Sequence, residues 1–423
     1  MSSERLIITN TNMLDIHSLK FKPNQTIVME NNKFTWIGDE GSFEKQESDT
    51  VNNGEGKYVI PGMMDLHVHL SYTHKVILDM NNTMMRHKDA YWEYWALKNS
   101  QQYLNYGFTT LRGCGSHKGL SSLREIIDEG VIPGPRLKLA LEGIGQPGNQ
   151  EAFGPQHFLD ANKELETTSG KDGVIHAVRD RKSKGSDHIK TATTGGVVHG
   201  KGSDVNLSLW RDEELEAMVS EAERLGIYVA AHAHADVGIS AAVRTGVRSI
   251  EHCSMPTEET LDNMVKMKTY LVATQSAVNF INFAPEKVKA MLPPEIISKW
   301  KRVSQDANEN HKLAFQKGIP IALGTDAPVA GDHCHSPLEL KLLVQNVGMT
   351  PLQAIEAGTK TAARVIQMED QLGSIEVGKL ADLVLLEKSP EADITIFEDL
   401  NNLFKVIKDG KIVSEKGKLK HYY

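Results

Sequence analysis

The chain has 423 residues, of which 40% are hydrophobic and 24% are charged, a composition typical of a globular protein with a sizeable core. The net charge of -8 argues against a nucleic-acid partner, because no basic surface would offset the phosphates. No apolar run has the length of a membrane span or of a signal-peptide core, and the three cysteines show no CxxC spacing. We therefore expect a cytoplasmic protein with no nucleic-acid or membrane partner.

Both ends of the chain have strand patterns. Residues 1–61 contain short segments rich in β-branched and aromatic residues, such as Arg5–Thr9 and Phe34–Ile37, separated by Asn-rich turns. Residues 372–423 look alike, and Asp409-Gly410 between two apolar pairs is typical of a tight hairpin. We predict that the two ends combine into one small β-sandwich domain.

The middle of the chain, residues 62–371, alternates apolar runs with helical patterns. Ser208 is a candidate cap for one helix, and Thr350-Pro351 is typical of the start of another. Regular strand–helix alternation favours a parallel sheet, and eight repeats predict an α/β fold with a closed (β/α)8 barrel of the TIM type. The eight apolar runs are Gly62–Leu70, Gly107–Gly115, Arg136–Gly145, His188–Gly196, Ile227–Ala235, Val247–Ser254, Thr269–Ser276 and Ile319–Pro328.

Side chains that can bind a metal ion lie at the ends of several of these runs. Alternate residues of a strand share one face, so His67 and His69 point the same way. The carboxyl ends of barrel strands meet at one mouth, and imidazole and carboxylate groups are natural ligands of Zn²⁺ and similar ions. Each residue alone could be a core histidine, a cap or a surface lysine, but independent placement would not put them all at the same strand end. The candidates are His67, His69, Lys190, His232, His234, His252 and Asp326.

This pattern resembles the amidohydrolase superfamily of metal-dependent hydrolases over nearly the whole chain. Within it, the chain is most similar to the imidazolonepropionase-like group that includes Xaa-Pro dipeptidases, arginine-type carboxypeptidases and ochratoxin amidases. The motifs that carry the resemblance are Pro61–His69 (PGMMDLHVH), Lys190–Gly196 (KTATTGG), Ala231–His234 (AHAH), Ile250–His252 (IEH), Gly324–Asp326 (GTD) and Gly373–Leu385 (GSIEVGKLADLVL).

The resemblance implies a barrel that holds two divalent metal ions, with zinc as the expected metal. It implies that His67, His69 and Asp326 bind the more buried ion. Two ions lower the pKa of a shared water toward ~7, and the more exposed ion can polarise the scissile carbonyl. Asp326 would act as the general base for the bridging hydroxide and return the proton to the leaving nitrogen.

The resemblance also implies that His232 and His252 bind the more exposed ion. Lys190 matches the lysine that bridges the two ions in the binuclear branch, where CO₂ converts the amine into an anionic carbamate. His234 points the same way as His232 by strand alternation, and we expect it to support the site or face the substrate.

The residues that select the substrate follow a less regular pattern. Relatives often have a histidine in the turn after strand three, but this chain has none between Leu141 and His157, so Gln146, Asn149 or His157 is the expected substitute. Residues 145–172 are either a lid or an insert. Arg112 and His199 are candidates for contact with a substrate carboxylate, although a salt bridge is the default explanation of Arg112. Four aromatic residues either wall a pocket or pack on an outer helix: Tyr72, Trp92, Tyr94 and Trp95.

The leading functional hypothesis is a binuclear metallohydrolase that cleaves an amide bond in N-acyl amino acids or dipeptides. The alternatives are hydrolysis of a cyclic amide, a lactone or an ester at the same site, and a mononuclear deaminase. A non-catalytic barrel is disfavoured, because such proteins usually lose metal ligands. All six ligands that the resemblance implies are present here, namely His67, His69, Lys190, His232, His252 and Asp326. Barrels of this family often form homo-oligomers, but no residue pattern identifies an interface.

Overall fold

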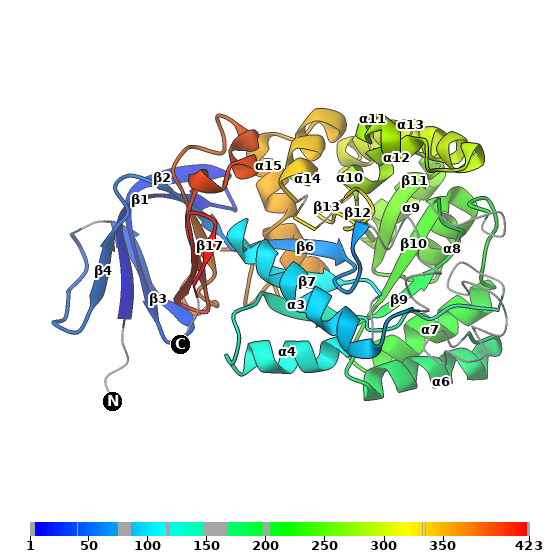
Figure 1. Ribbon diagram of the computed structural model, residues 1–423, viewed down its shortest axis with the longest axis horizontal. Helices are drawn as coiled ribbons and strands as arrows, with labels where there is room; N and C mark the ends of the chain where they lie inside the picture. Colours follow the sequence, from blue (N-terminus) through cyan, green and yellow to red (C-terminus); the bar gives the residue numbers. More distant parts are fainter. Residues whose placement is uncertain are drawn as a thin grey trace.

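The computed structural model describes residues 5–39, 41–74, 86–115, 119–147, 167–197, 204–331, 333–334 and 336–420. A sheet built from both ends of the chain lies beside an α/β region formed by the residues between them (Figure 1). The two chain ends therefore lie in this sheet, and the candidate ligands lie in the α/β region beside it.

Strands from both chain ends form one continuous nine-stranded sheet. The two halves join where β5 pairs antiparallel with β14, with Ile60 opposite Val384. The order is β17-β16-β15-β14-β5-β1-β2-β3, and β4 pairs with β1. The strands are β1 (Arg5–Asp15), β2 (Lys20–Glu30), β3 (Lys33–Asp39), β4 (Thr50–Asn53), β5 (Tyr58–Pro61), β14 (Leu383–Leu386), β15 (Leu403–Lys408), β16 (Lys411–Glu415) and β17 (Lys418–Leu419).

The two halves of this sheet share one apolar cluster. Ile8 and Phe34 from the N-terminal strands pack in the same cluster as Leu383 and Ile407 from the C-terminal strands. The predicted hairpin at Asp409-Gly410 is confirmed, because both residues have positive φ (49° and 74°) and join β15 to β16. The sequence pattern thus located these strands, and their union comes from pairing between the chain ends.

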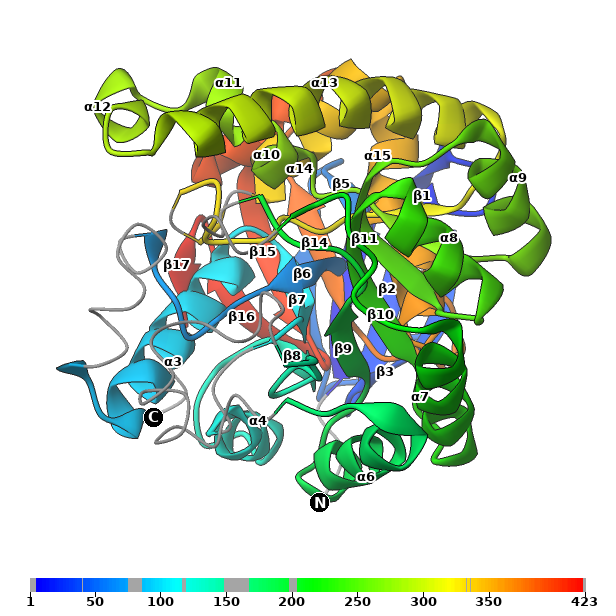
Figure 2. The same cartoon turned by 90° about the vertical axis from the view of Figure 1, so that its right-hand side faces the viewer.

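Each of the eight apolar runs of the middle region coincides with a parallel strand to within a few residues. They form a three-stranded sheet, β6-β7-β8, and a five-stranded sheet, β13-β12-β11-β10-β9. Figure 2 shows these strands in the centre with helices around them. The strands are β6 (Met63–Val68), β7 (Phe108–Gly113), β8 (Arg136–Leu139), β9 (Ile189–Ala192), β10 (Val229–Ala235), β11 (Ser249–Met255), β12 (Tyr270–Val272) and β13 (Ile321–Ala322).

Backbone hydrogen bonds connect the two parallel sheets at both of their junctions. At one junction the Leu66 N–H donates to the Leu323 carbonyl at 3.0 Å, and the Asp326 N–H donates to the His67 carbonyl at 2.7 Å. At the other, the Ile144 N–H donates to the Lys190 carbonyl at 2.8 Å. Both junctions lie at candidate ligands, so the backbone itself fixes how these residues face one another.

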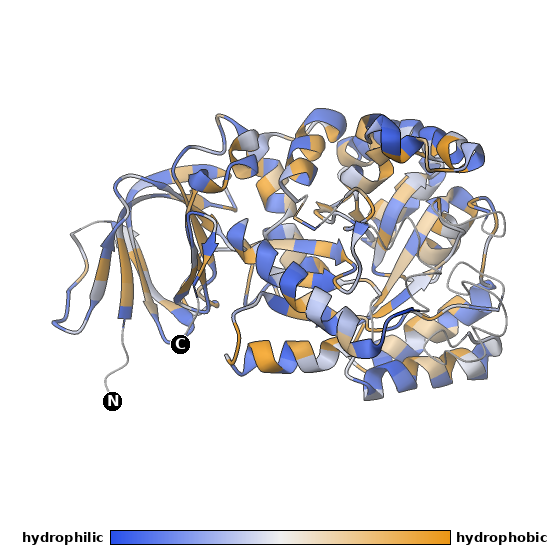
Figure 3. Ribbon diagram, viewed as in Figure 1, coloured by the Kyte–Doolittle hydropathy of each residue, from blue (hydrophilic) through white to orange (hydrophobic). Residues whose placement is uncertain are grey.

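Helices surround the parallel strands, and apolar and polar residues alternate along them, as expected for helices with one buried side (Figure 3). Over the described ranges, none of these helices combines the length and the apolar character needed to cross a bilayer. The α-helices are α3 (Asp89–Asn105), α4 (Leu120–Asp128), α6 (Gly170–Ser183), α7 (Asp212–Arg224), α8 (Asp236–Arg244), α9 (Glu258–Met267), α10 (Gln275–Val278), α11 (Phe280–Phe283), α12 (Glu286–Lys289), α13 (Pro294–Gln316), α14 (Ser336–Leu342), α15 (Pro351–Ala357) and α16 (Lys360–Val365), with a π-helix at Leu343–Val347 and 3₁₀ turns at Ile394–Glu398 and Leu400–Asn402.

One of the two predicted helix starts is confirmed. The Thr350 side chain accepts a hydrogen bond from the Gln353 N–H, and α15 begins at Pro351. The prediction for Ser208 is wrong, because its hydroxyl donates to the Trp210 carbonyl and α7 begins at Asp212. The competing local hydrogen bond keeps this serine outside the helix.

An ion-pair cluster links the terminal sheet to the start of a parallel strand. Arg136 in β8 donates to Asp382 at 2.8 Å and to Asp409 at 2.6 Å. The Asp382 side chain is 3% exposed and the Asp409 side chain is 32% exposed. Burial disfavours the ionised form of Asp382, but Arg136 outweighs this effect and lowers the pKa of the carboxyl.

We predict that Asp382→Asn lowers the free energy of unfolding by about 3 kcal/mol, because it leaves the Arg136 charge with one partner fewer in a largely buried site. A carboxyl with a lowered pKa in the folded state stabilises the fold above its unfolded pKa of about 4, and this contribution disappears as the pH falls further. Urea unfolding at pH 7 and in acid measures both effects. Asp409→Asn is the control, since its partly exposed side chain should matter less; equal losses for the two variants would contradict the prediction.

Candidate metal centre

Four parallel strands carry or directly precede the candidate ligands, apart from Asp326, which follows a fifth. His67 is 1% exposed and Lys190 is 5% exposed, so the site is set into the protein. The strands that carry or precede the ligands are β6 for His67 and His69, β9 for Lys190, β10 for His232 and His234, β11 for His252, and β13 for Asp326.

His67, His69 and Asp326 form a first group of possible metal ligands. The His69 Nε2 atom lies 3.0 Å from Asp326 Oδ1, and the His67 Nε2 atom lies 3.3 Å from the same oxygen. One ligand atom of each residue lies within 4.8 Å of the others. The Lys190 Nζ atom is 3.3 Å from His67 Nε2, so the lysine reaches the edge of this group.

His232, His234 and His252 form a second group with the same spacing. The rings of His232 and His252 have centroids 4.5 Å apart, and His234 stacks on His252 at 4.9 Å. The rings of His67 and His252 are 5.1 Å apart, which places the second group directly beside the first. The structure therefore brings all seven candidates together, and His234 belongs to the second group just as His232 and His252 do.

Two of the candidate ligands have unusual backbone conformations. His252 has a φ of 71° and Asp326 has a φ of 57°, in the left-handed region that residues other than glycine seldom adopt. Strand alternation would point Glu251 and His252 to opposite faces. The turn at His252 instead lets both side chains reach His67, Glu251 by a hydrogen bond and His252 by ring contact. Strained backbone of this kind is often found at functional sites.

The Nδ1 nitrogen of four of these imidazoles is held by a protein group, and His234 Nδ1 lies 2.8 Å from Ser254 Oγ. His67 Nδ1 lies 2.8 Å from Glu251 Oε2, His69 Nδ1 lies 2.7 Å from the Gly115 carbonyl, and His252 Nδ1 lies 2.7 Å from Thr274 Oγ1. When each Nδ1 donates its proton to that oxygen, Nε2 carries the lone pair that a metal ion requires. The contacts thus orient the rings and select the tautomer suited to metal binding.

Arg112 forms a salt bridge, which was its default explanation. Its side chain is fully buried, and it donates to Glu251 at 2.7 Å, to the Leu66 carbonyl at 2.6 Å and to Ser249 at 3.0 Å. The internal ion pair with Glu251 therefore accounts for Arg112, and its contact with a substrate carboxylate stays a prediction. The sequence did signal Glu251, which directly precedes His252, but regular alternation would have turned its side chain away from the site.

Burial and charge set the protonation states at the centre. Burial, together with the Lys190 charge, lowers the pKa of His67 to about 4. Burial disfavours ionised Glu251 and Asp326, but Arg112 and His67 lower the pKa of Glu251, and His67 and His69 lower that of Asp326. Neutral imidazoles beside ionised carboxylates are the forms that bind divalent cations.

Cys114 lies within the same spacing of His67 and Glu251, so it belongs to a third possible group. Burial raises the pKa of its thiol to about 11, and its Sγ atom contacts the Leu66 carbonyl at 3.4 Å. A neutral thiol is a poor ligand, and His67 Nδ1 is already bonded to Glu251. This third group is therefore a poorer candidate for a metal ion than the first two.

The other predicted contacts have mixed outcomes. Gln146 is partly buried and lies two residues after Ile144, whose N–H donates to the Lys190 carbonyl. Tyr72 stacks near His69 with centroids 6.2 Å apart, and buried Trp92 packs edge-on against Tyr72. Tyr94 is 73% exposed and does not share that packing, while Trp95 is partly buried against Tyr91. Asn149, His157, His199 and most of the proposed lid lie outside the described residues.

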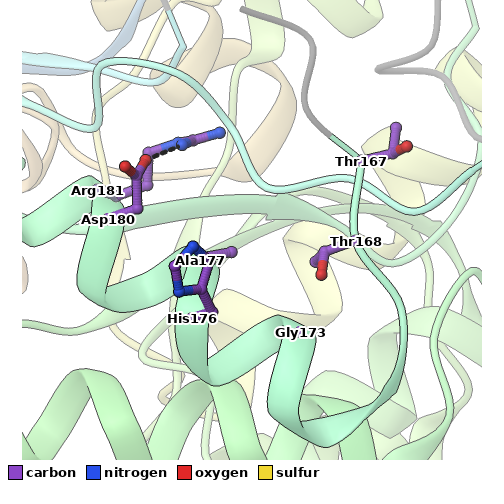
Figure 4. A pocket seen from close by; sticks show the side chains of 7 residues that line it. All are labelled: Thr167, Thr168, Gly173, His176, Ala177, Asp180 and Arg181. Carbon is purple, nitrogen blue, oxygen red and sulfur yellow. Dashed lines mark hydrogen bonds and ion pairs between the residues drawn. The ribbon is translucent and has the colours of Figure 1, made fainter. Parts of the chain in front are cut away.

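A cavity of about 120 Å³ lies along α6 and the segment before it, and is lined by none of the candidate ligands (Figure 4). His176, Asp180 and Arg181 line it together with smaller residues. Arg181 donates to Asp180 and to the Glu142 carbonyl, so the charge of this arginine is already paired.

We predict that Glu251→Gln lowers the free energy of unfolding by about 3 kcal/mol, because it removes the charge that balances buried Arg112. The double variant Arg112→Met/Glu251→Gln should recover part of this loss, since it removes the uncompensated cation. Guanidinium unfolding of both variants and of Arg112→Met completes a double-mutant cycle. A coupling of zero between the two positions would contradict the ion-pair interpretation.

Comparison with known proteins agrees with this arrangement of strands and side chains. The sequence profile of the amidohydrolase family matches residues 58–413. An ochratoxinase from Aspergillus niger is 26% identical over 411 residues, which cover 93% of this chain and 84% of that protein. An imidazolonepropionase from Geobacillus sp. (strain WCH70) is 24% identical over 431 residues, covering 96% of this chain and 93% of the relative.

Solved structures of similar proteins also superpose closely on this chain. The crystal structure of a Xaa-Pro dipeptidase with bound methionine superposes with a TM-score of 0.87 at 31% identity, covering 97% of this chain and 100% of that one. The A. niger ochratoxinase structure superposes with a TM-score of 0.86 at 25% identity, covering 99% and 97% of the two chains. The chain therefore belongs to the amidohydrolase family and is a hydrolase that acts on carbon–nitrogen bonds.

Proposed function

We propose that the chain is a binuclear metal-dependent amidohydrolase that cleaves the amide bond of N-acyl amino acids or dipeptides. The observation that carries the proposal is the contact between the two ligand groups, with His67 and His252 5.1 Å apart and Lys190 Nζ 3.3 Å from His67 Nε2. A similar solved structure is named a Xaa-Pro dipeptidase, which favours dipeptides among the amide substrates.

The proposal includes the architecture around the site. The hydrogen bonds at both junctions of the parallel sheets support one closed (β/α)8 barrel over residues 62–371. Residues 1–61 and 372–423 would form the β-sandwich domain, whose two halves share one cluster. Such a barrel brings the ends of its strands around one mouth, where the candidate ligands lie.

The donor set fits divalent ions, with zinc as the proposed metal. His67, His69 and Asp326 would hold one ion, and His232 and His252 would hold the other, because imidazole and carboxylate groups suit Zn²⁺ and similar ions. Bound divalent ions lower the pKa of water and polarise a carbonyl group.

Lys190 would join the two ligand groups after carboxylation. As an ammonium it would repel cations beside His67, whereas the neutral amine can add to CO₂ and release a proton. The new N–C bond gives a carbamate with two oxygens and a negative charge. The burial of Lys190, at 5% exposure, would protect this adduct from water.

Asp326 is the proposed general base and acid. Its carboxylate lies at the centre of the first group and is kept ionised by the neighbouring histidines, which lower its pKa. It would accept the proton of the attacking water and return it to the leaving nitrogen, the step that makes an amide nitrogen able to depart. His234, stacked on His252 and bonded to Ser254, would face the substrate beside them.

We predict that the purified protein contains two equivalents of divalent metal. The Lys190→Ala variant should contain fewer than two equivalents and should lose at least ~100-fold in kcat/KM. Elemental analysis, intact-mass detection of a 44 Da adduct on Lys190, and activity before and after chelation are the measurements. Lys184→Ala is the matched control, because that lysine is 40% exposed on the outer surface. An active protein without bound metal, or normal activity of Lys190→Ala, would contradict the binuclear site.

We predict that Asp326→Asn lowers kcat by ~10²- to 10⁴-fold, the usual loss for a general base. The substrate panel contains N-acyl amino acids, dipeptides, their C-terminal amides, cyclic amides, lactones and esters, with a separate assay for ammonia. Preference for a free carboxylate beside the amide supports the proposed substrate class. Faster turnover of a cyclic amide or a lactone would replace the proposed substrate class with that alternative. Release of ammonia from substrates that carry no C-terminal amide would indicate a deaminase instead.

A further inference from the structure

We propose that three consecutive residues just beyond β12, Thr274–Ser276 at the start of α10, position ligands of both groups at once, and that Glu339 anchors them. β12 lies between β11, which carries His252, and β13, which leads to Asp326. No ligand was assigned to β12, yet its carboxyl end lies between two strands that supply one. The inference rests on the proposed function, since positioning matters only if these side chains bind metal ions.

The first two residues of the segment hold His252 at two points. Thr274 Oγ1 pairs with the His252 ring at 2.7 Å. Gln275 Nε2 donates to His311 Nδ1 at 2.7 Å, and His311 Nε2 donates to the His252 carbonyl at 2.6 Å. His252 has a φ of 71°, so contacts to both its ring and its carbonyl are needed to keep that conformation.

The third residue acts on the other group. The Ser276 hydroxyl donates to the Thr325 carbonyl at 3.0 Å, the peptide group directly before Asp326. Asp326 has a φ of 57°, and its own N–H donates to the His67 carbonyl at 2.7 Å. The peptide that carries Asp326 is thus fixed on one side by Ser276 and on the other by β6.

Buried groups hold the segment itself in place. Glu339 in α14 is fully buried and accepts the Gln275 N–H and the Ser276 N–H, both at 2.7 Å. The Gln275 Oε1 atom accepts from Asn279 at 2.9 Å and from Asn346 at 2.8 Å. These bonds orient the Gln275 amide so that its Nε2 atom faces His311. Since a buried polar network is rigid when its members are satisfied, the segment can transmit position to both groups.

The test compares Thr274→Val and Ser276→Ala, which remove one hydroxyl each with little change in shape. Thr359→Val and Ser186→Ala are matched controls, because these buried hydroxyls donate to carbonyls of Ile355 at 2.7 Å and Ala140 at 2.8 Å, away from the ligands. Metal affinity is measured for each of the two equivalents by competition with a chelator. Outer contacts of this kind usually change metal affinity 10- to 100-fold, so we expect about a 10-fold loss.

Thr274→Val should lower the affinity for the metal ion bound by His252, and Ser276→Ala should lower the affinity for the ion bound by Asp326. Glu339→Ala should lower both affinities. Thr274→Ser, which restores the hydroxyl, should rescue binding, a result that a general loss of stability would not produce. Affinities of Thr274→Val and Ser276→Ala equal to those of the controls would overturn the proposal.

A metal-free measurement separates this proposal from the proposed function. Hydrogen exchange in chelator should be faster around residues 249–256 in Thr274→Val and around residues 321–331 in Ser276→Ala than in the controls. If the wild type binds no metal, the binuclear function fails while this comparison still tests the positioning contacts. Unchanged exchange at both regions would overturn the positioning role whatever the metal content.

Discussion

The hydrogen bond between His67 and Glu251 connects the candidate metal centre to the interior of the strands. A buried imidazole without a partner on its second nitrogen could rotate or change tautomer, and the ligand atom would then leave the site. Glu251 prevents this, and it remains ionised because Arg112 supplies the opposite charge at 2.7 Å. Arg112 also reaches the Leu66 carbonyl, so the same ion pair joins β6, β7 and β11.

This arrangement replaces apolar packing with charge in the middle of the fold, and such a replacement is costly. Desolvating two charges costs several kcal/mol for each ion, which only close geometry and additional hydrogen bonds can offset. Both are present, since Ser249 also donates to Glu251 at 2.7 Å. The cost is acceptable where the same groups orient a ligand, and a hydrophobic core at this level would leave His67 without a fixed orientation.

Most of the strands and the meeting of the candidate ligands could be predicted from the sequence, because both follow a simple period. Alternation within a strand predicted that His67 and His69 share a face, and the shared strand end predicted the meeting with Asp326. Glu251 escaped the same reasoning because the positive φ of His252 breaks the alternation there. Arg112 was located at the correct strand end, but its burial depends on partners from β6 and β11 that are far away in the sequence.

Pairing between β5 and β14 has a consequence for how the chain folds during synthesis. More than three hundred residues separate the two strands, so β1 to β5 leave the ribosome long before their partner exists. Until then β5 presents an open edge of backbone groups, the kind of surface that pairs readily with other chains. The parallel strands and the candidate ligands are synthesised in that interval, so the terminal sheet can be completed only after all of them have been made.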